Sequence, residues 1–152
     1  MNPKPSVLFL CVHNAGKSQM AAALMRQIAG DRVEVYSAGT NPDEQVHDLS
    51  AQAVAEIGAD MTGQQPQRVD TGLVARVDRV IVLGSEAKIA APAGMKGALH
   101  TWIIPDPAER GIDGIERVRI MRDDIRARVQ TLAGELIGGP GPQSPARDGA
   151  DP

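Results

Sequence analysis

The sequence predicts an α/β fold, a three-layer sandwich in which helices cover both faces of a central four-stranded parallel sheet. Two apolar segments, residues 7–10 and 80–83, lack alternating polar residues, which is typical of strands buried on both faces. Helix-forming segments separate the expected strands, as in sheets whose parallel strands are joined by helical crossovers. Only one Trp, one Tyr and one Phe are present, so we expect a core of Val, Ile, Leu, Met and Ala.

The first half of the chain contains two units of a strand followed by a helix. In order, we expect a strand at 7–10 that ends at Cys11, a helix at 18–29, a strand at 33–37 and a helix at 50–57 with Ser50 as its cap. Gly39 and the Asn41-Pro42 pair mark a long loop after the second strand. A loop therefore follows the carboxyl end of each of these strands.

The second half contains the remaining strands and the longest helix. We expect a strand at 79–83, a short helix starting at Gly84-Ser85-Glu86, a strand at 99–103 and a helix at 115–136. Pro105 and Pro107 end the fourth strand because proline has no N–H for the ladder. The last helix has apolar residues at a spacing of three and four, and an i,i+4 pair of Asp124 and Arg128.

Composition defines the domain and excludes several classes of function. Residues 1–137 are expected to form one domain, and residues 138–152, without large apolar side chains, a disordered tail. The net charge of -3 argues against nonspecific nucleic-acid binding, and no apolar run has the length of a signal peptide or a membrane span. We therefore expect a soluble, cytoplasmic protein that binds neither nucleic acid nor membranes.

The single cysteine, Cys11, restricts the chemistry further. One cysteine forms no intramolecular disulfide and no Cys-based zinc site. His13, His47 and His100 show no metal-ligand spacing, so we expect no metal site. Cys11 is then either a buried apolar residue, the commoner case for a lone cysteine after a strand, or a reactive thiol.

The loop from Cys11 to Ser18 favours the reactive thiol. In parallel α/β sheets ligands bind beyond the carboxyl ends of the strands. A loop that enters a helix N-terminus directs backbone N–H groups and the positive end of the helix dipole at one point, which suits a tetrahedral oxyanion. The same field stabilises a thiolate, which is the nucleophilic form of cysteine. Gly16 permits close approach of the backbone, Asn14 tolerates left-handed angles, and Lys17 supplies a positive charge.

Two further interpretations concern Gly16-Lys17-Ser18 and Asp106. Gly16-Lys17-Ser18 matches the end of the nucleotide-binding pattern G-x-x-x-x-G-K-[ST], but Cys11 stands where the first glycine is required. Asp106, between two prolines, is a candidate general acid, although Pro-Asp-Pro is in the first place a turn signal.

Three segments together resemble the low-molecular-weight protein tyrosine phosphatase superfamily, over residues 5–137. They are the run VLFLCVHNAGKSQMAA at 7–22, the run SAGT at 37–40, and Asp106-Pro107. Residues 14–21, 109–117 and 122–125 look more like the arsenate reductase branch, and more narrowly like the arsenate-mycothiol transferases of actinobacteria.

The resemblance implies roles for individual residues. Cys11 would be the active-site thiolate, Ser18 would stabilise it by a hydrogen bond, and Asp106 would correspond to the general acid. Asn14 and Ser37 would hold the loop in shape, and Lys17 stands where the phosphatases have an arginine. The catalytic set would then be Cys11, Lys17, Ser18 and Asp106. The oxyanion would be bound by Val12, His13, Asn14, Ala15, Gly16, Lys17 and Ser18.

The resemblance also implies a reaction. Arsenate would be joined to mycothiol, a cosubstrate, and mycoredoxin would later release arsenite, with no tightly bound cofactor. Thioredoxin-linked reductases of this fold use two further cysteines that this chain lacks, so the thiol must come from outside. Two alternatives remain: a protein tyrosine phosphatase that forms a phosphocysteine, and a noncatalytic oxyanion-binding protein. Lys17 and the scarcity of aromatic residues to hold a tyrosine ring disfavour the phosphatase.

Overall fold

The structure of the chain is a computed structural model that describes residues 4–138. The strands are β1 (Ser6–Cys11), β2 (Glu34–Gly39), β3 (Arg79–Leu83) and β4 (Ala98–Trp102). The helices are α1 (Lys17–Ala29), α2 (Asp48–Ala55), α3 (Thr71–Arg76) and α4 (Gly114–Ala133). Short helical turns lie at Gly30–Arg32, Pro107–Arg110 and Gly134–Gly138. Apart from Gly138, the predicted tail at 138–152 lies outside the described residues.

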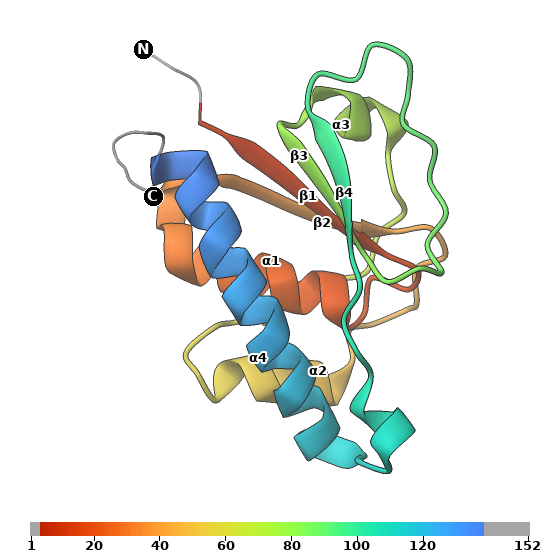
Figure 1. The fold of residues 1–152 in the computed structure, drawn as a ribbon, viewed down its shortest axis with the longest axis vertical. Coiled ribbons are helices and arrows are strands. Elements are labelled where there is room, and N and C mark those ends of the chain that lie inside the picture. Colours follow the sequence, from red (N-terminus) through yellow and green to blue (C-terminus); the bar gives the residue numbers. More distant parts are fainter. Residues whose placement is uncertain (1–3, 139–152) are drawn as a thin grey trace.

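The four strands form one parallel sheet in the order β2-β1-β3-β4 (Figure 1). β1 therefore lies inside the sheet, between β2 and β3. Its last residue, Cys11, stands opposite Gly39 at the end of β2. The carboxyl ends of the two strands thus bring the two loops that follow them side by side.

Side chains of β1 alternate between two apolar cores, and all six of its residues are buried. Val7 and Phe9 face the core that includes α1 and α4. Leu8 and Leu10 face the smaller core that includes Leu73 of α3. Helices α1, α2 and α4 cover one face of the sheet and α3 the other (Figure 1), which confirms the predicted three-layer α/β fold.

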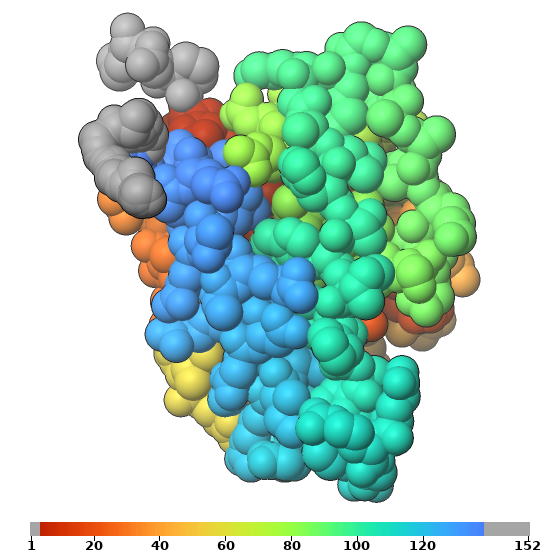
Figure 2. All heavy atoms as spheres, viewed as in Figure 1, coloured from red at the N-terminus to blue at the C-terminus, as the bar shows by residue number. Residues whose placement is uncertain are grey.

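The surface over β4 shows how the last part of the chain is arranged. In Figure 2 the green residues between β3 and β4, with β4 itself, form one side of this face, and the blue α4 crosses the other.

The predicted pair within α4 is confirmed, with Arg128 Nε 2.9 Å from Asp124 Oδ1. No helix among the described residues is both long and apolar enough to span a membrane.

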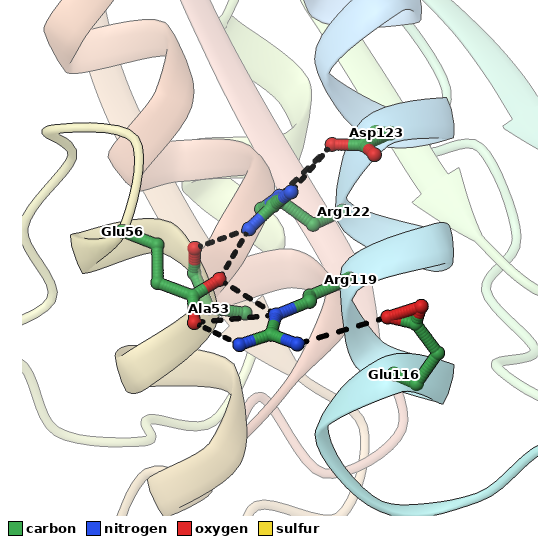
Figure 3. A network of polar contacts seen from close by, with 6 residues as sticks. All are labelled: Ala53, Glu56, Glu116, Arg119, Arg122 and Asp123. Atoms are coloured by element: carbon green, nitrogen blue, oxygen red, sulfur yellow. Dashed lines mark hydrogen bonds and ion pairs between the residues drawn. The ribbon is translucent and has the colours of Figure 1, made fainter.

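A polar network joins α4 to α2 (Figure 3). Arg122, whose side chain is 10% exposed, donates to the Ala53 carbonyl at 2.9 Å and to Glu56 at 2.8 Å. Arg119 donates to the same carboxylate at 2.6 Å. Hydrogen bonds from Arg119 and then Arg122 lower the pKa of Glu56 from its ordinary 4.5 to about 2. The ionised carboxylate therefore holds two arginines of α4 against α2.

Two expectations about local structure were wrong. α2 begins at Asp48, two residues before the predicted cap, because the N–H of His47 is already fixed by the Ala15 carbonyl at 2.8 Å; Ser50 lies buried inside the helix. No helix starts at Gly84, which has a φ of 99° and continues the sheet by donating to the Trp102 carbonyl at 2.9 Å.

One helix was missed and one strand is displaced. α3 is short, and its N-terminus is capped by Asp70, whose carboxylate accepts the Gly72 N–H at 3.0 Å. Asp70-Thr71 is a capping signal that sequence reasoning did not use. The fourth strand spans 98–102 instead of 99–103, a difference of one residue at each end.

Replacing Glu56 with Gln is expected to lower the thermal midpoint at pH 7 by about 2–4 °C, because the charge that pairs both arginines is lost. A carboxyl with a lowered pKa stabilises the fold above its ordinary pKa, and this contribution disappears as the pH falls. The midpoint difference between wild type and variant should thus be constant above about pH 5 and shrink from there toward pH 2. Circular dichroism melts measure it.

Glu116→Gln is the matched control for this prediction. Glu116 is 61% exposed and contacts Arg119 at 3.7 Å only, so its replacement should change the midpoint little. Equal effects of the two variants at pH 7 would contradict the role assigned to Glu56.

Candidate active site

Cys11 lies at the end of β1, with 8% of its surface exposed. Its sulfur accepts the Asn14 backbone N–H at 3.2 Å and lies 2.9 Å from the Ser18 hydroxyl oxygen. Asn14 has a φ of 51°, the only positive φ among non-glycine residues of the described chain, and this turn brings its N–H back to the sulfur. The loop therefore wraps around the thiol that precedes it.

A chain of hydrogen bonds orients the Ser18 hydroxyl. Asn14 Oδ1 accepts the Gln67 backbone N–H at 2.9 Å and the Gln19 side-chain N–H at 3.3 Å. The NH2 group of Asn14 therefore points away from these two residues, toward Ser18. That group donates to Ser18 Oγ at 2.7 Å. The Ser18 oxygen thus accepts from Asn14, and its hydrogen is left for the Cys11 sulfur, where it stabilises a thiolate.

The segment that follows β2 donates hydrogen bonds to the carbonyl groups of the Cys11 loop. Backbone N–H groups of this segment donate to four of these carbonyls: Thr40 to Cys11 at 3.2 Å, Asn41 to Val12 at 2.7 Å, Asp43 to His13 at 3.0 Å and His47 to Ala15 at 2.8 Å. The loop's carbonyl dipoles are therefore directed outward, toward the neighbouring segment. Its N–H groups are left on the inner side.

The inner side of the loop has the properties of an anion site. Within residues 4–138, the N–H groups of Val12, His13, Ala15 and Gly16 donate to no atom of the chain. α1 begins at Lys17, so the positive end of its dipole faces the same place. These N–H groups can donate to the oxygens of a bound tetrahedral anion.

A cavity of about 590 Å³ opens over the Cys11 loop. Its walls are formed by Cys11, Val12, His13, Ala15, Gly16, Lys17, Asp43, His47, Leu83 and Glu86. Lys17 forms no ion pair within 4.0 Å among the described residues, and it is the one cation that lines this cavity. Asn14 and Ser18 are fully buried behind the sulfur instead.

Asp106 lies outside this cavity lining, in the loop after β4. Arg117 donates to its two carboxylate oxygens at 2.7 Å each, and the Ala108 N–H donates at 3.0 Å. The Arg117 hydrogen bonds, followed by the Ala108 bond, hold the pKa of Asp106 well below its ordinary range, and Lys17 adds a smaller effect. The carboxylate is therefore ionised and restrained at neutral pH.

Ser37 and Gln67 show how the loop is held from outside. Ser37 is buried in β2, and its hydroxyl forms no hydrogen bond with the described residues; its carbonyl accepts the Gln67 side chain at 2.8 Å. Gln67 also donates its backbone N–H to Asn14, so it links β2 to the loop. Sequence reasoning missed Gln67, as it missed Asp43 and Glu86, because single polar residues in irregular segments carry no local pattern.

The described residues provide no metal centre. Within 4–138, no three His, Cys, Asp or Glu side chains are grouped so that they could hold a metal ion. The chemistry available at the site is therefore that of one thiol, backbone donors, Lys17 and the side chains of the cavity wall.

The chain matches one family model over nearly its whole described length. The model of low molecular weight phosphotyrosine protein phosphatase matches residues 6–138. An arsenate reductase of Bacillus cereus (strain 03BB102) is 33% identical over 135 residues, which is 88% of this chain and 97% of the relative.

Solved structures agree with this match. A Corynebacterium glutamicum thioredoxin-dependent arsenate reductase has a TM-score of 0.74 and 31% identity, over 89% of this chain and 63% of that one. The chain thus spans less than two thirds of the length of that structure. An arsenate reductase in the phosphate binding state has a TM-score of 0.75 and 25% identity, over 87% of this chain and 98% of that one.

Gly39→Ala is expected to disrupt anion binding while leaving the sheet intact. A Cβ at this position would lie 2.5 Å from the Val12 carbonyl oxygen and 3.0 Å from Asn14, so the Cys11 loop must shift. We expect the affinity for inorganic phosphate, read from its protection of Cys11 against iodoacetamide, to fall by about tenfold or more. Gly134→Ala is the control, because a Cβ there meets nothing within 4 Å. Unchanged protection in the Gly39 variant would refute the argument.

Proposed function

Because the chain belongs to the low molecular weight phosphotyrosine protein phosphatase family, and to its arsenate reductase branch, we propose that it is a cytoplasmic arsenate reductase that uses an external thiol. The observation that carries this proposal is the Cys11 loop itself. Its free N–H groups suit a tetrahedral oxyanion, and its sulfur is held by Asn14 and the oriented Ser18 hydroxyl.

The external thiol follows from the cysteine count. Reduction of arsenate to arsenite needs two electrons, which two thiols supply when they form a disulfide. The chain has one cysteine, so it forms no internal disulfide, and at least one thiol comes from another molecule. This distinguishes the proposal from a mechanism with an internal cysteine relay.

The cavity wall favours a thiol without negative charge. Asp43 and Glu86 line the same cavity as a single cation, Lys17, and bound arsenate adds further negative charge. A thiol with carboxylates would be repelled there. Mycothiol carries sugar and inositol hydroxyls and no carboxylate, and we propose it as the cosubstrate.

The proposed reaction proceeds in two steps. The mycothiol sulfur forms a bond to arsenic, an arsenate oxygen leaves as water, and arsenic remains pentavalent. A mycoredoxin thiolate then attacks the mycothiol sulfur of this adduct, which gives a mixed disulfide and releases arsenite. The two electrons pass from the sulfurs to arsenic in the second step.

The Asp106 geometry does not favour a phosphatase. A phosphatase of this fold would use Asp106 to protonate the leaving group, yet this carboxylate is ionised, paired with Arg117 and outside the cavity lining. The cavity is also lined by no Phe, Tyr or Trp side chain that could stack on a phosphotyrosine ring.

The central experiment measures arsenate conversion with purified protein, mycothiol, mycoredoxin and an NADPH-linked reductase. We expect NADPH consumption that requires arsenate and mycothiol, and a loss of about a hundredfold in Cys11→Ser, because the loop that holds arsenate is folded around the Cys11 sulfur. Aryl phosphate hydrolysis, measured in parallel, should be negligible.

Each contrary result has a defined meaning. Rapid aryl phosphate hydrolysis without thiol dependence would make the protein a phosphatase. No activity in either assay, with phosphate still protecting Cys11 from alkylation, would show that the protein is a noncatalytic oxyanion-binding protein.

Thiol selectivity tests the charge argument separately. Glutathione carries a net negative charge, so its kcat/KM should be lower than that of mycothiol. Glu86→Gln removes one of the two carboxylates of the wall and should raise kcat/KM for glutathione by about two- to fivefold, with a smaller gain at high salt. Glu109→Gln, at an exposed position outside the cavity lining, should change neither value. Equal gains for both thiols in Glu86→Gln would contradict the argument.

A further inference from the structure

His13 and Asp43 form a pair at the mouth of the cavity that contains Cys11. His13 Nδ1 lies 3.2 Å from Asp43 Oδ1 and 3.1 Å from the Asn41 carbonyl oxygen. Their side chains are 57% and 53% exposed, and both line the cavity. The pair thus stands in contact with solvent and with the space in which an external thiol must approach.

The neighbours of His13 determine which ring nitrogen carries the proton. A carbonyl oxygen only accepts hydrogen bonds, so Nδ1 must donate to the Asn41 carbonyl, and the Asp43 carboxylate lies 3.2 Å from the same nitrogen. In the neutral ring the lone pair is then on Nε2, which forms no hydrogen bond with any described residue. Nε2 is therefore free to accept a proton.

The backbone holds this pair in place. The Asp43 N–H donates to the His13 carbonyl at 3.0 Å, so the two residues are joined through main chain as well as side chain. The Asn41 N–H donates to the Val12 carbonyl at 2.7 Å and fixes the segment on the other side. The orientation of the imidazole is therefore set before any ligand binds.

The other charged and titratable groups of the cavity come from different elements. Lys17 begins α1, His47 precedes α2 and Glu86 follows β3. His47 Nδ1 is already engaged with the Ser50 hydroxyl at 3.1 Å. Of the two cavity histidines, His13 is the one whose Nδ1 donates to a backbone carbonyl and has a carboxylate beside it, which leaves Nε2 as the acceptor that a general base needs.

We propose that His13, oriented by Asp43, is the general base that removes the proton from the external thiol. The inference rests on the proposed function, because it concerns the thiol of that reaction. Ordinary alkyl thiols are mostly protonated at neutral pH, and only the thiolate is a nucleophile. Cys11 has its own donors at Asn14 and Ser18, whereas an incoming thiol arrives protonated and needs an acceptor.

The proton transfers balance within the first step of the reaction. The S–H bond of the thiol breaks and its proton passes to His13 Nε2 as the sulfur forms a bond to arsenic. The bond from arsenic to a hydroxyl group of the arsenate breaks, and this hydroxyl takes the proton from the imidazolium and departs as water. Arsenic stays pentavalent, and His13 returns to its starting state.

His13→Gln tests the proposal with two thiols. With mycothiol, kcat/KM should fall by about a hundredfold. With an acidic aryl thiol, which is already ionised at neutral pH, variant and wild type should differ by less than about threefold. Asp43→Asn should show the same pattern with a smaller loss, about tenfold.

Controls separate base catalysis from structural damage. His100→Gln, on β4 and outside this cavity, should match wild type with both thiols. Phosphate protection of Cys11 should be unchanged in His13→Gln, since the loop backbone that binds the anion is retained.

The contrary outcomes are distinct. An equal loss with both thiols in His13→Gln would show a positioning role, and no loss with mycothiol would show no role; either result overturns the proposal. If the wild-type protein is inactive with every thiol, the proposed function fails first and this inference with it.

Discussion

The site depends on the close approach of two loops at Gly39. A side chain there would collide with the Val12 carbonyl, so only glycine lets the segment after β2 lie against the Cys11 loop. That segment then binds four carbonyls of the loop through its own N–H groups, between Thr40 and His47. Because the carbonyls are engaged outward, the N–H groups of the loop are left facing inward. One backbone contact thus creates the anion site and also places Asp43 beside His13.

The sequence predicted the parts of the site that are continuous in the chain. The apolar run into Cys11, the loop and α1 share a local pattern, and a positive φ at Asn14 was foreseen from its tolerance of left-handed angles. The contacts of Gln67 and Asp43 were not foreseen, because they join irregular segments far apart in sequence. α2 was displaced for the same reason: a long-range bond from His47 to Ala15, and not the Ser50 hydroxyl, fixes where it begins.

Charge is distributed unevenly around the thiol. Behind the sulfur, neutral donors arranged through Asn14 and Ser18 stabilise negative charge without adding any ionised group. In front, Lys17 forms no ion pair among the described residues, and Asp106, whose pKa Lys17 also lowers, is paired with Arg117. Arg117 therefore affects the site indirectly: by pairing with Asp106 it leaves the charge of Lys17 available for an anion.

Two sulfurs meet at this site and require different surroundings, which the two sides of the cavity provide. Cys11 is almost fully buried and does not leave, so fixed hydrogen-bond donors can hold its sulfur in one place within the anion loop. An external thiol enters from solvent with its proton, so it needs a group that accepts the proton at the moment of attack and can later release it. An exposed imidazole whose tautomer is fixed by the Asn41 carbonyl meets that need, whereas a buried donor network does not. The separation of a buried network from an exposed histidine is thus what a single-cysteine enzyme that depends on an outside thiol requires.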